Sequence, residues 1–159
     1  MDLELRGKVA LVTGSSRGIG LATAKAFAAE GCRIMLSARS TEQLRETETA
    51  LRATGAEIAA HAADVASPDG AARLIEATVA ACGGIDVIIN NVGGGGGGAR
   101  VADSSDDDWR GALERNLVQT VRMMRLALPR MKERPGAAVI KAGRRSSRCR
   151  ANTARPRRR

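Results

Sequence analysis

Several residue types on which particular kinds of site depend are rare or absent in this sequence. Its 159 residues include no tyrosine, one histidine and three cysteines. The absence of tyrosine excludes every mechanism that needs a phenol. The cysteines lie far apart at positions 32, 82 and 149, and His61 cannot complete a zinc site with them. We therefore exclude a disulfide scaffold and a zinc domain, expect no bound metal, and expect a reducing cytoplasm as the location.

Long apolar runs and a secretory signal are absent as well. No run of apolar residues approaches the roughly 18–20 that a membrane-spanning helix needs. The first four residues, Met-Asp-Leu-Glu, carry acids where a secretory signal would carry positive charge. Both observations favour a cytoplasmic protein that does not enter a membrane.

Acidic residues are absent from one end of the chain. Residues 1–140 hold 17 basic and 17 acidic side chains, whereas residues 141–159 hold nine basic side chains and no acidic ones, which accounts for the net charge of +9. Hydrophobic patterning also stops after Ile140, where arginine, serine, alanine and proline take over. We therefore expect a neutral globular domain at residues 1–140 and a disordered, arginine-rich tail at residues 141–159.

Within residues 1–140, short apolar runs alternate with helical patterns. Gly31, Gly55 and Gly83 stand where helices end, and Ser40 and Ser67 stand where helices begin. The predicted strands are residues 8–13, 32–37, 57–61, 85–89 and 137–140, and the predicted helices are residues 18–30, 41–54, 68–82 and about 105–134. Because strand and helix alternate, we predict the α/β class, as a doubly wound parallel sheet of about five strands with helices on both faces.

The last of these helices carries a long apolar stripe. We expect one long helix that Ser104 or Ser105 caps. The apolar residues of its stripe follow one another at a spacing of three or four: Trp109, Leu113, Leu117, Val121, Met124, Leu128 and Met131. This stripe holds more apolar area than one face of a sheet needs, so we expect part of it to stay exposed. The six glycines at residues 93–98, before this helix, predict a mobile loop.

A glycine-rich turn joins the first strand to the first helix, with the sequence Thr-Gly-Ser-Ser-Arg-Gly-Ile-Gly at residues 13–20. Gly14 permits a tight turn, Gly18 lets the backbone approach a pyrophosphate, and Gly20 allows close packing of helix on strand. The helix N-terminus offers free N–H groups and a partial positive charge to phosphates. Its position after the first strand favours a dinucleotide site over the alternative, a glycine-rich turn without a ligand.

This turn resembles the cofactor motif of the short-chain dehydrogenase/reductase family. Asp64 and Val65 follow the third strand, where the family contacts the adenine ring, and Asn-Asn-Val-Gly at residues 90–93 resembles the family's Asn-Asn-Ala-Gly. Asn116, within Glu-Arg-Asn-Leu, stands where the family keeps a catalytic asparagine. The resemblance covers about residues 5–140. It implies a Rossmann-like sheet and the transfer of a hydride between a nicotinamide cofactor and a small-molecule carbonyl or alcohol.

The end of the second strand favours NADP over NAD as the cofactor. An enzyme that selects NAD commonly has an acid there for the ribose 2′-hydroxyl, whereas this strand ends Ser37-Ala38-Arg39. Arg17 and Arg39 could both reach a 2′-phosphate, which a guanidinium binds bidentately. The alternative is that both are solvated surface arginines.

The predicted site residues thus fall into two groups. Asn116 is the predicted catalytic residue. The predicted cofactor-binding residues are Gly14, Ser16, Arg17, Gly18, Ile19, Gly20, Ser37, Arg39, Asp64, Val65, Asn91 and Gly93. Two alternatives stay open: the asparagines after the fourth strand could serve only neighbouring backbone groups, and Asn116 could be an ordinary surface position. We interpret His61 as a packing or edge residue.

The resemblance also implies catalytic groups that this sequence does not contain. The family uses a tyrosine as general acid and base, a lysine that lowers its pKa and a serine that orients the substrate. Here Lys141 and an arginine-rich segment stand in their place. We therefore expect the cofactor-binding part of the family fold with its C-terminal part missing, and impaired catalysis. A reading-frame break near residue 140, a truncated gene and a genuine tail are the alternative explanations.

Two functions from different classes remain. The first is an NADP-dependent oxidoreductase that interconverts ketones and alcohols, with 3-oxoacyl-thioester reductases among the commonest relatives. The family's homo-oligomer is doubtful for this chain, because the helix that would follow is absent. The second is a non-enzymatic protein whose tail binds nucleic acid or another polyanion without sequence preference. Against the second, the tail has no aromatic residue to stack on bases and no patterned helix.

Overall fold

The computed structural model describes residues 3–94, 101–132 and 134–142, and it contains a five-stranded parallel sheet. The strand order is β3-β2-β1-β4-β5, so the first strand lies in the middle and the chain winds outward from it in both directions. The strands are β1 (Val9–Thr13), β2 (Arg33–Ala38), β3 (Ile58–Ala62), β4 (Val87–Asn90) and β5 (Ala138–Lys141). This arrangement confirms the predicted Rossmann-like, doubly wound sheet.

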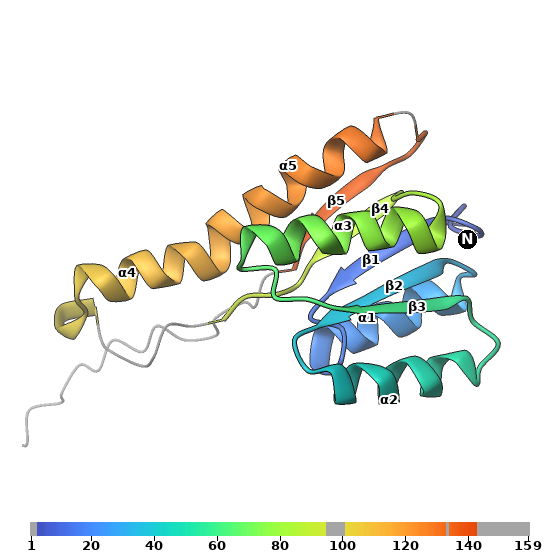
Figure 1. Cartoon of the computed structure of the whole chain (residues 1–159), viewed down its shortest axis with the longest axis horizontal. Helices are drawn as coiled ribbons and strands as arrows, with labels where there is room; N and C mark the ends of the chain where they lie inside the picture. Colours follow the sequence, from blue (N-terminus) through green and yellow to red (C-terminus); the bar gives the residue numbers. More distant parts are fainter. Residues whose placement is uncertain (1–2, 95–100, 133, 143–159) are drawn as a thin grey trace, which may run out of the picture.

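Helices cover both faces of the sheet (Figure 1). Helices α1 (Gly18–Ala29) and α2 (Thr41–Arg52) lie on one face, and α3 (Pro68–Cys82) and α5 (Gln119–Met131) lie on the other. The Ser40 hydroxyl accepts a hydrogen bond from the Gln43 N–H, and the Ser67 hydroxyl accepts one from the Gly70 N–H. The predicted starts of α2 and α3 are therefore confirmed, because each serine satisfies a backbone donor of the first turn.

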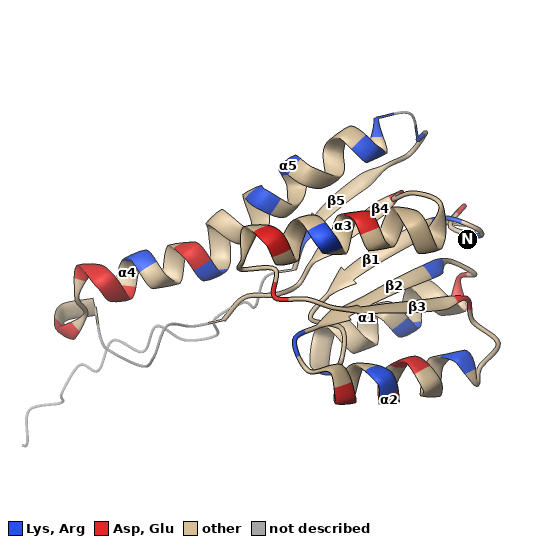
Figure 2. Cartoon of the chain, viewed as in Figure 1, with Lys and Arg blue, Asp and Glu red and all other residues tan. Residues whose placement is uncertain are grey.

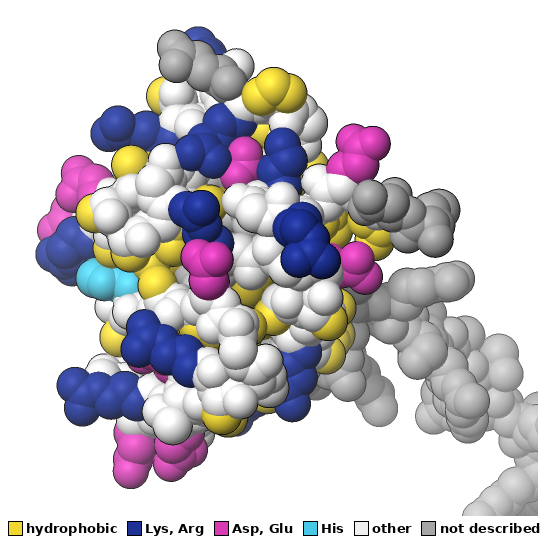
Figure 3. Space-filling model, turned by 90° about the vertical axis from the view of Figure 1, so that its right-hand side faces the viewer, with side chains coloured by type: hydrophobic (Ala, Val, Ile, Leu, Met, Phe, Trp, Pro, Cys, Tyr) yellow, Lys and Arg dark blue, Asp and Glu magenta, His cyan; other side chains and the backbone are white. Residues whose placement is uncertain are grey.

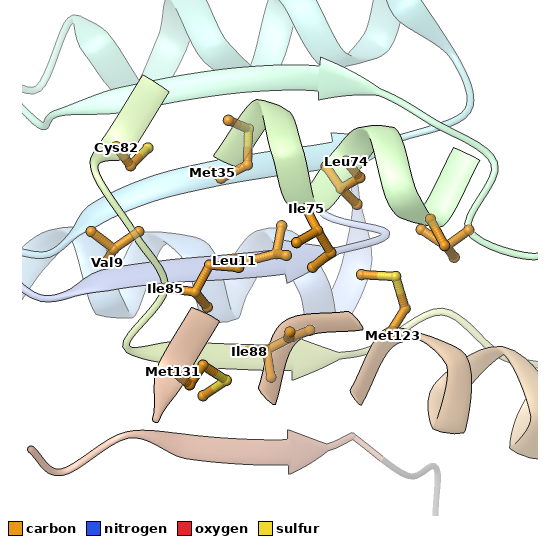
Figure 4. Packing of buried hydrophobic residues seen from close by; sticks show 13 residues of the cluster. Val9, Leu11, Met35, Leu74, Ile75, Cys82, Ile85, Ile88, Met123 and Met131 are labelled. Atoms are coloured by element: carbon orange, nitrogen blue, oxygen red, sulfur yellow. The ribbon is translucent and has the colours of Figure 1, made fainter. Parts of the chain in front are cut away.

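The core consists of two apolar layers, one on each side of the sheet. Successive residues of a strand point to opposite faces, so Leu11 packs toward α3 and α5, whereas Val12 packs toward α1 and α2. Figure 4 shows the first layer, in which Leu11 and Ile88 from the strands meet Leu74 and Met123 from the helices. The central strands β1 and β4 are buried on both faces, as their continuous apolar runs indicate.

The long helix before β5 contains a π-helical segment that the sequence does not indicate. It consists of α4 (Asp106–Leu113), a π-helical segment η2 (Glu114–Val118) and α5, and a short 3-10 turn η1 (Val101–Asp103) precedes it. Ser105 caps α4 in a reciprocal pair of contacts with Asp108, which identifies the cap among the two candidates. The predicted long helix is therefore present, with a π turn, which adds a residue to the helix, near its middle.

The apolar stripe of this helix faces outward for most of its length. Helix α4 contains no buried residue and extends beyond the sheet (Figure 1). Five members of the stripe are 45–54% exposed: Trp109, Leu113, Leu117, Val121 and Leu128. Beyond the π turn, the face of α5 that packs inward is instead Gln119, Thr120, Met123, Ala127 and Met131. The stripe is therefore mainly an outer surface, and only Met131 belongs to both faces.

Charged residues lie mostly on the helices and rarely on the strands (Figure 2). Figure 3 views the molecule from the end at which the strands begin, and it shows basic and acidic side chains interspersed there. In the described ranges, no helix is long and apolar enough to span a membrane. Most of the glycine run and of the arginine-rich tail, for which the sequence predicts mobility and disorder, lies outside the described residues.

Candidate functional site

The predicted site residues lie at one edge of the sheet, where the parallel strands end. The loops after β1, β2, β3 and β4 all leave from this edge because the strands are parallel. The order of the strands reverses between β1 and β4, since the chain continues from β1 to one side and returns to the other. Open α/β sheets bind ligands in the crevice at such a switch point.

The glycine-rich turn after β1 depends on three glycines for different reasons. Gly14 and Gly18 have φ angles of +65° and +57°, which favour glycine. A Cβ atom on Gly20 would overlap the Gly14 carbonyl oxygen and lie 2.6 Å from the Asn91 Nδ2 atom. A Cβ atom on Gly18 would meet no other group within 4 Å. Gly20 is therefore needed for packing, whereas Gly18 presents open backbone to the solvent.

Helix α1 begins in this turn without a side-chain cap. Its N-cap residue is Arg17, whose side chain makes no capping hydrogen bond, and its first turn contains no acidic residue. In contrast, serines cap α2, α3 and α4. In the described part of the chain, no side chain therefore caps the first N–H groups of α1, which stand at the positive end of its helix dipole.

Thr13 and Asn91 tie the turn after β1 to the turn after β4. The Thr13 hydroxyl donates to the Ile89 carbonyl (3.2 Å) and accepts from the N–H groups of Asn91 (3.0 Å) and Val92 (3.2 Å). The Asn91 amide donates to the carbonyl oxygens of Thr13 (3.0 Å) and Gly14 (3.2 Å). Asn91 thus holds the glycine-rich turn in place. As the structural alternative proposed, its side chain bonds neighbouring backbone groups.

Ser15 and Ser37 connect the turn after β1 to the end of β2. The Ser15 N–H donates to the Ser37 carbonyl (3.0 Å), and the Ser37 N–H donates to the Ser15 hydroxyl (2.9 Å). The Ser37 hydroxyl is buried and has no partner within the described residues. Arg17 and Arg39 are both exposed at this edge. A buried hydroxyl that has no partner in the described part of the chain is unusual, because most buried polar groups are hydrogen-bonded.

The loop after β3 holds Asp64 and Val65 by different means. The Asp64 side chain is exposed and accepts a hydrogen bond from the Ala66 N–H (3.0 Å), while its backbone carbonyl accepts one from the Ser67 hydroxyl (3.0 Å). Val65 is only 4% exposed and belongs to the core layer under α3 and α5. His61, on the edge strand β3, is partly buried. The loop is thus anchored from below and presents its carboxylate to the solvent.

Asn116 lies in the π-helical segment and reaches the loop after β4. Its Oδ1 atom accepts a hydrogen bond from the Gly94 N–H (3.0 Å), and its Nδ2 atom donates to the Gly94 carbonyl (2.9 Å) and to the Ala112 carbonyl (2.9 Å). A Cβ atom on Gly93 would lie 2.9 Å from Asn116 Oδ1. Asn116 therefore pairs with the backbone of this loop, so it is not an isolated surface residue.

Two side chains that are not among the predicted site residues meet at the Val92 carbonyl. Gln119 donates to this oxygen from Nε2 (2.9 Å), and Lys141 donates to it from Nζ (3.2 Å). Partial burial lowers the pKa of the Lys141 ammonium from its usual value. No sequence pattern marks either residue, because the contact depends on how α5 and β5 approach β4. A small hollow next to Gln119 is lined by both polar and apolar residues: Thr13, Val65, Asn90, Val92, Gln119, Thr120 and Met123.

An ion pair between the buried Asp86 and the partly exposed Arg134 holds the opposite edge of the sheet together. The Asp86 carboxylate accepts from the Val9 N–H (2.8 Å) and pairs with the Arg134 guanidinium (2.8 Å), which also donates to the Gly83 carbonyl (2.6 Å). Asp86 is the one acid in the otherwise apolar run at residues 85–89. This pair lies away from the crevice and fixes the amino ends of β1 and β4.

Comparison with known proteins identifies the family of this fold and site. The family model described as short chain dehydrogenase matches residues 8–150. The chain belongs to the short chain dehydrogenase family, as the motifs of the glycine-rich turn and the Asn-Asn-Val-Gly segment predict. Dehydrogenase/reductase SDR family member 4 of Sus scrofa is 31% identical over 136 residues, which are 86% of this chain and 49% of that protein.

Solved structures resemble this chain both in fold and in sequence. The L-sorbose reductase of Gluconobacter frateurii, complexed with NADPH and L-sorbose, is 38% identical and superimposes with a TM-score of 0.83, over 89% of this chain and 54% of that one. A short chain dehydrogenase/reductase from Burkholderia phymatum in complex with NAD is 31% identical, with a TM-score of 0.80, over 87% and 50%. The chain spans about half the length of the relatives that it matches.

Proposed function

We propose that this chain is the cofactor-binding part of a nicotinamide-dependent oxidoreductase and that it binds NADP(H) in preference to NAD(H). The observation that carries the proposal is the start of α1, which has no side-chain cap and whose first residue, Gly18, has open space around its backbone. Relatives in the same family were solved with NADPH in one case and with NAD in another. Family membership therefore supports a nicotinamide cofactor, and the choice between the two forms must come from this chain's own residues.

Different residues at this edge of the sheet would bind different parts of the cofactor. The N–H groups of residues 18–20 would hold the pyrophosphate at the positive end of α1. Arg17 and Arg39 would pair with a 2′-phosphate, and Ser37 would offer its unpartnered hydroxyl to the adjoining ribose. Asp64 and Val65 would border the adenine ring. Residues 37–39 at the end of β2 include no acid to bind a free 2′-hydroxyl, and this supports NADP over NAD.

The nicotinamide end would lie over the loop after β4. When bound, the nicotinamide would supply or accept a hydride. Asn116, through its pairing with Gly94, would hold this loop in shape beneath the ring. The substrate would be a small-molecule ketone or alcohol, with a 3-oxoacyl thioester as one candidate. The 159 residues contain no tyrosine to move the proton that must accompany the hydride, so we expect little turnover from this chain alone.

Titration calorimetry with NADPH and NADH tests the proposal. We expect tighter binding of NADPH, because charge-assisted hydrogen bonds from arginine are each worth about 1.5–3 kcal/mol. Arg39→Ala should weaken NADPH binding roughly tenfold and leave NADH binding unchanged; we take the lower end of the range because Arg39 is exposed.

Arg73→Ala is the matched control, since it removes the same charge from the exposed face of α3, away from the crevice. It should leave both affinities unchanged. Equal affinity for the two cofactors, or an equal loss of NADPH binding in both variants, would contradict the assignment of Arg39. No binding of either cofactor by a folded chain would contradict the function itself.

A further inference from the structure

Arg122 on α5 connects two parts of the crevice that are distant in the sequence. Its Nη1 atom donates to the Ala66 carbonyl (2.6 Å), in the loop after β3. Its Nη2 atom pairs with the Glu114 carboxylate (3.0 Å), at the first residue of the π-helical segment. The Arg122 side chain is only 15% exposed. A guanidinium fork that bonds both partners from a mostly buried position fixes the distance between them.

Each end of this connection continues directly to a predicted site residue. At one end, the Ala66 N–H donates to the Asp64 carboxylate, so the same peptide segment carries the adenine-side acid. At the other end, Glu114 lies two residues before Asn116 in the π-helical turn, and Asn116 pairs with the Gly94 backbone. The contacts therefore run without interruption from the loop after β3 to the loop after β4.

The π-helical turn is suited to respond to such a connection. Within the helix that runs from α4 to α5, η2 is the segment where the hydrogen-bond pattern departs from α, and none of its residues is buried. A π turn within an α-helix is a less stable arrangement that surrounding contacts maintain. Arg122 supplies one of those contacts from the adenine side, and Gly94 supplies another from the nicotinamide side.

We propose that Arg122 is a positioning residue that couples occupancy of the adenine side to the order of the Asn116 turn, through its bonds to the Ala66 carbonyl and the Glu114 carboxylate. The inference rests on the proposed cofactor function and adds a direction to it. When the adenosine half of the cofactor settles against residues 64–66, it fixes the carbonyl that Arg122 holds. The guanidinium then holds Glu114, and the π-helical turn with Asn116 becomes more ordered before the nicotinamide half arrives.

The test uses adenosine 2′,5′-bisphosphate, which carries the adenine side of NADP and lacks the nicotinamide. Its binding to the full chain is measured by calorimetry, and amide hydrogen exchange is measured on peptides covering residues 112–120 at saturating ligand. Coupling between two sites commonly amounts to a factor of about 5–150. We expect at least about fivefold slower exchange at residues 112–120 in the wild-type chain.

Two variants break the connection and one serves as control. Arg122→Gln removes the guanidinium, and Glu114→Gln removes the ion pair from its partly exposed end while leaving the Arg122 bond to Ala66 available. In both, the bisphosphate should still bind but should no longer slow exchange at residues 112–120. Arg125→Gln removes an exposed arginine from the same helix and should respond as the wild type does. If Arg122→Gln fails to fold, Glu114→Gln carries the comparison.

The outcomes separate the inference from the proposed function. If the bisphosphate does not bind the folded wild-type chain, the cofactor proposal fails and the coupling fails with it. If it binds the wild type without slowing exchange at residues 112–120, the coupling is refuted while cofactor binding stands. If exchange slows equally in the wild type, Arg122→Gln and Glu114→Gln, Arg122 is a structural residue only and the inference is wrong.

Discussion

Alanine at Gly20 and alanine at Gly18 should have different consequences, although both glycines belong to the same turn. A Cβ atom on Gly20 would overlap the Gly14 carbonyl and lie 2.6 Å from the Asn91 amide nitrogen. The Gly14 carbonyl is backbone and cannot move aside without opening the turn. The Asn91 amide would have to leave two carbonyl acceptors, those of Thr13 and Gly14.

The magnitude follows from these contacts. Overpacking a tight site costs about 1–3 kcal/mol, and each lost hydrogen bond about 1 kcal/mol. Alanine regains about 1 kcal/mol through its higher helix propensity. We therefore expect Gly20→Ala to lower the free energy of unfolding by roughly 2–4 kcal/mol and Tm by roughly 6–12 °C, at about 3 °C per kcal/mol for a chain of this size. Gly18→Ala meets no neighbouring atom and should cost about 1 kcal/mol for its left-handed φ of +57°.

Urea denaturation and NADPH titration of both variants distinguish the two roles. Gly20→Ala should unfold at a lower urea concentration than the wild type. Gly18→Ala should stay folded and lose NADPH affinity, because its methyl group would occupy the open space next to the backbone that faces the pyrophosphate. Equal unfolding midpoints for Gly20→Ala and the wild type would refute the packing argument. Unchanged NADPH affinity in a folded Gly18→Ala variant would refute the position assigned to the pyrophosphate.

Two further substitutions and the turnover of the unaltered chain also have expected outcomes. Asp86→Ala should lower the free energy of unfolding by roughly 3 kcal/mol, because it leaves the Val9 N–H and the Arg134 guanidinium without their shared acceptor; a urea midpoint equal to that of the wild type would contradict this. Leu117→Glu should shift the chain toward monomer in sedimentation velocity, because it places a charge in the exposed apolar stripe; a wild type that already sediments as a monomer would show that the stripe does not mediate association. Purified chain should oxidise NADPH with ketones at a rate about 10²–10⁴-fold below that of an enzyme with a positioned acid, and an ordinary turnover rate free of host reductases would contradict the importance given to the absent tyrosine.

The sheet, the caps and the glycine-rich turn could be predicted because their signals are local. Ser67 before Pro68 predicts the start of α3, and Gly83 predicts its end. In the structure Gly83 has a left-handed φ of +80°. The meeting of the loops at one edge followed from the parallel order of the strands. Gly20 could be assigned to close packing from its place in the motif, and the contact with the Gly14 carbonyl supports that assignment.

The features that could not be predicted depend on long-range contacts. The π-helical turn surrounds Asn116, whose partner Gly94 lies 22 residues away, and no local pattern encodes that pairing. The sequence also does not indicate which face of α5 packs inward, because apolar residues lie on two sides of this helix. The sheet receives the side with Met123 and Ala127. The contact between Arg122 and Ala66 spans 56 residues and has no sequence signal.

The central claim is that NADP(H) binds at the carboxyl edge of the sheet, at the switch point between β1 and β4. The most direct test is to map amide chemical shifts of the ¹⁵N-labelled full chain during titration with NADPH. We predict that the largest changes fall on residues 14–20, 37–39 and 91–94, with smaller changes at residues 64–66. The amides near Asp86 at the opposite edge should not change. Shifts concentrated at that opposite edge or in residues 143–159, or no shifts at all in a folded sample, would contradict the account.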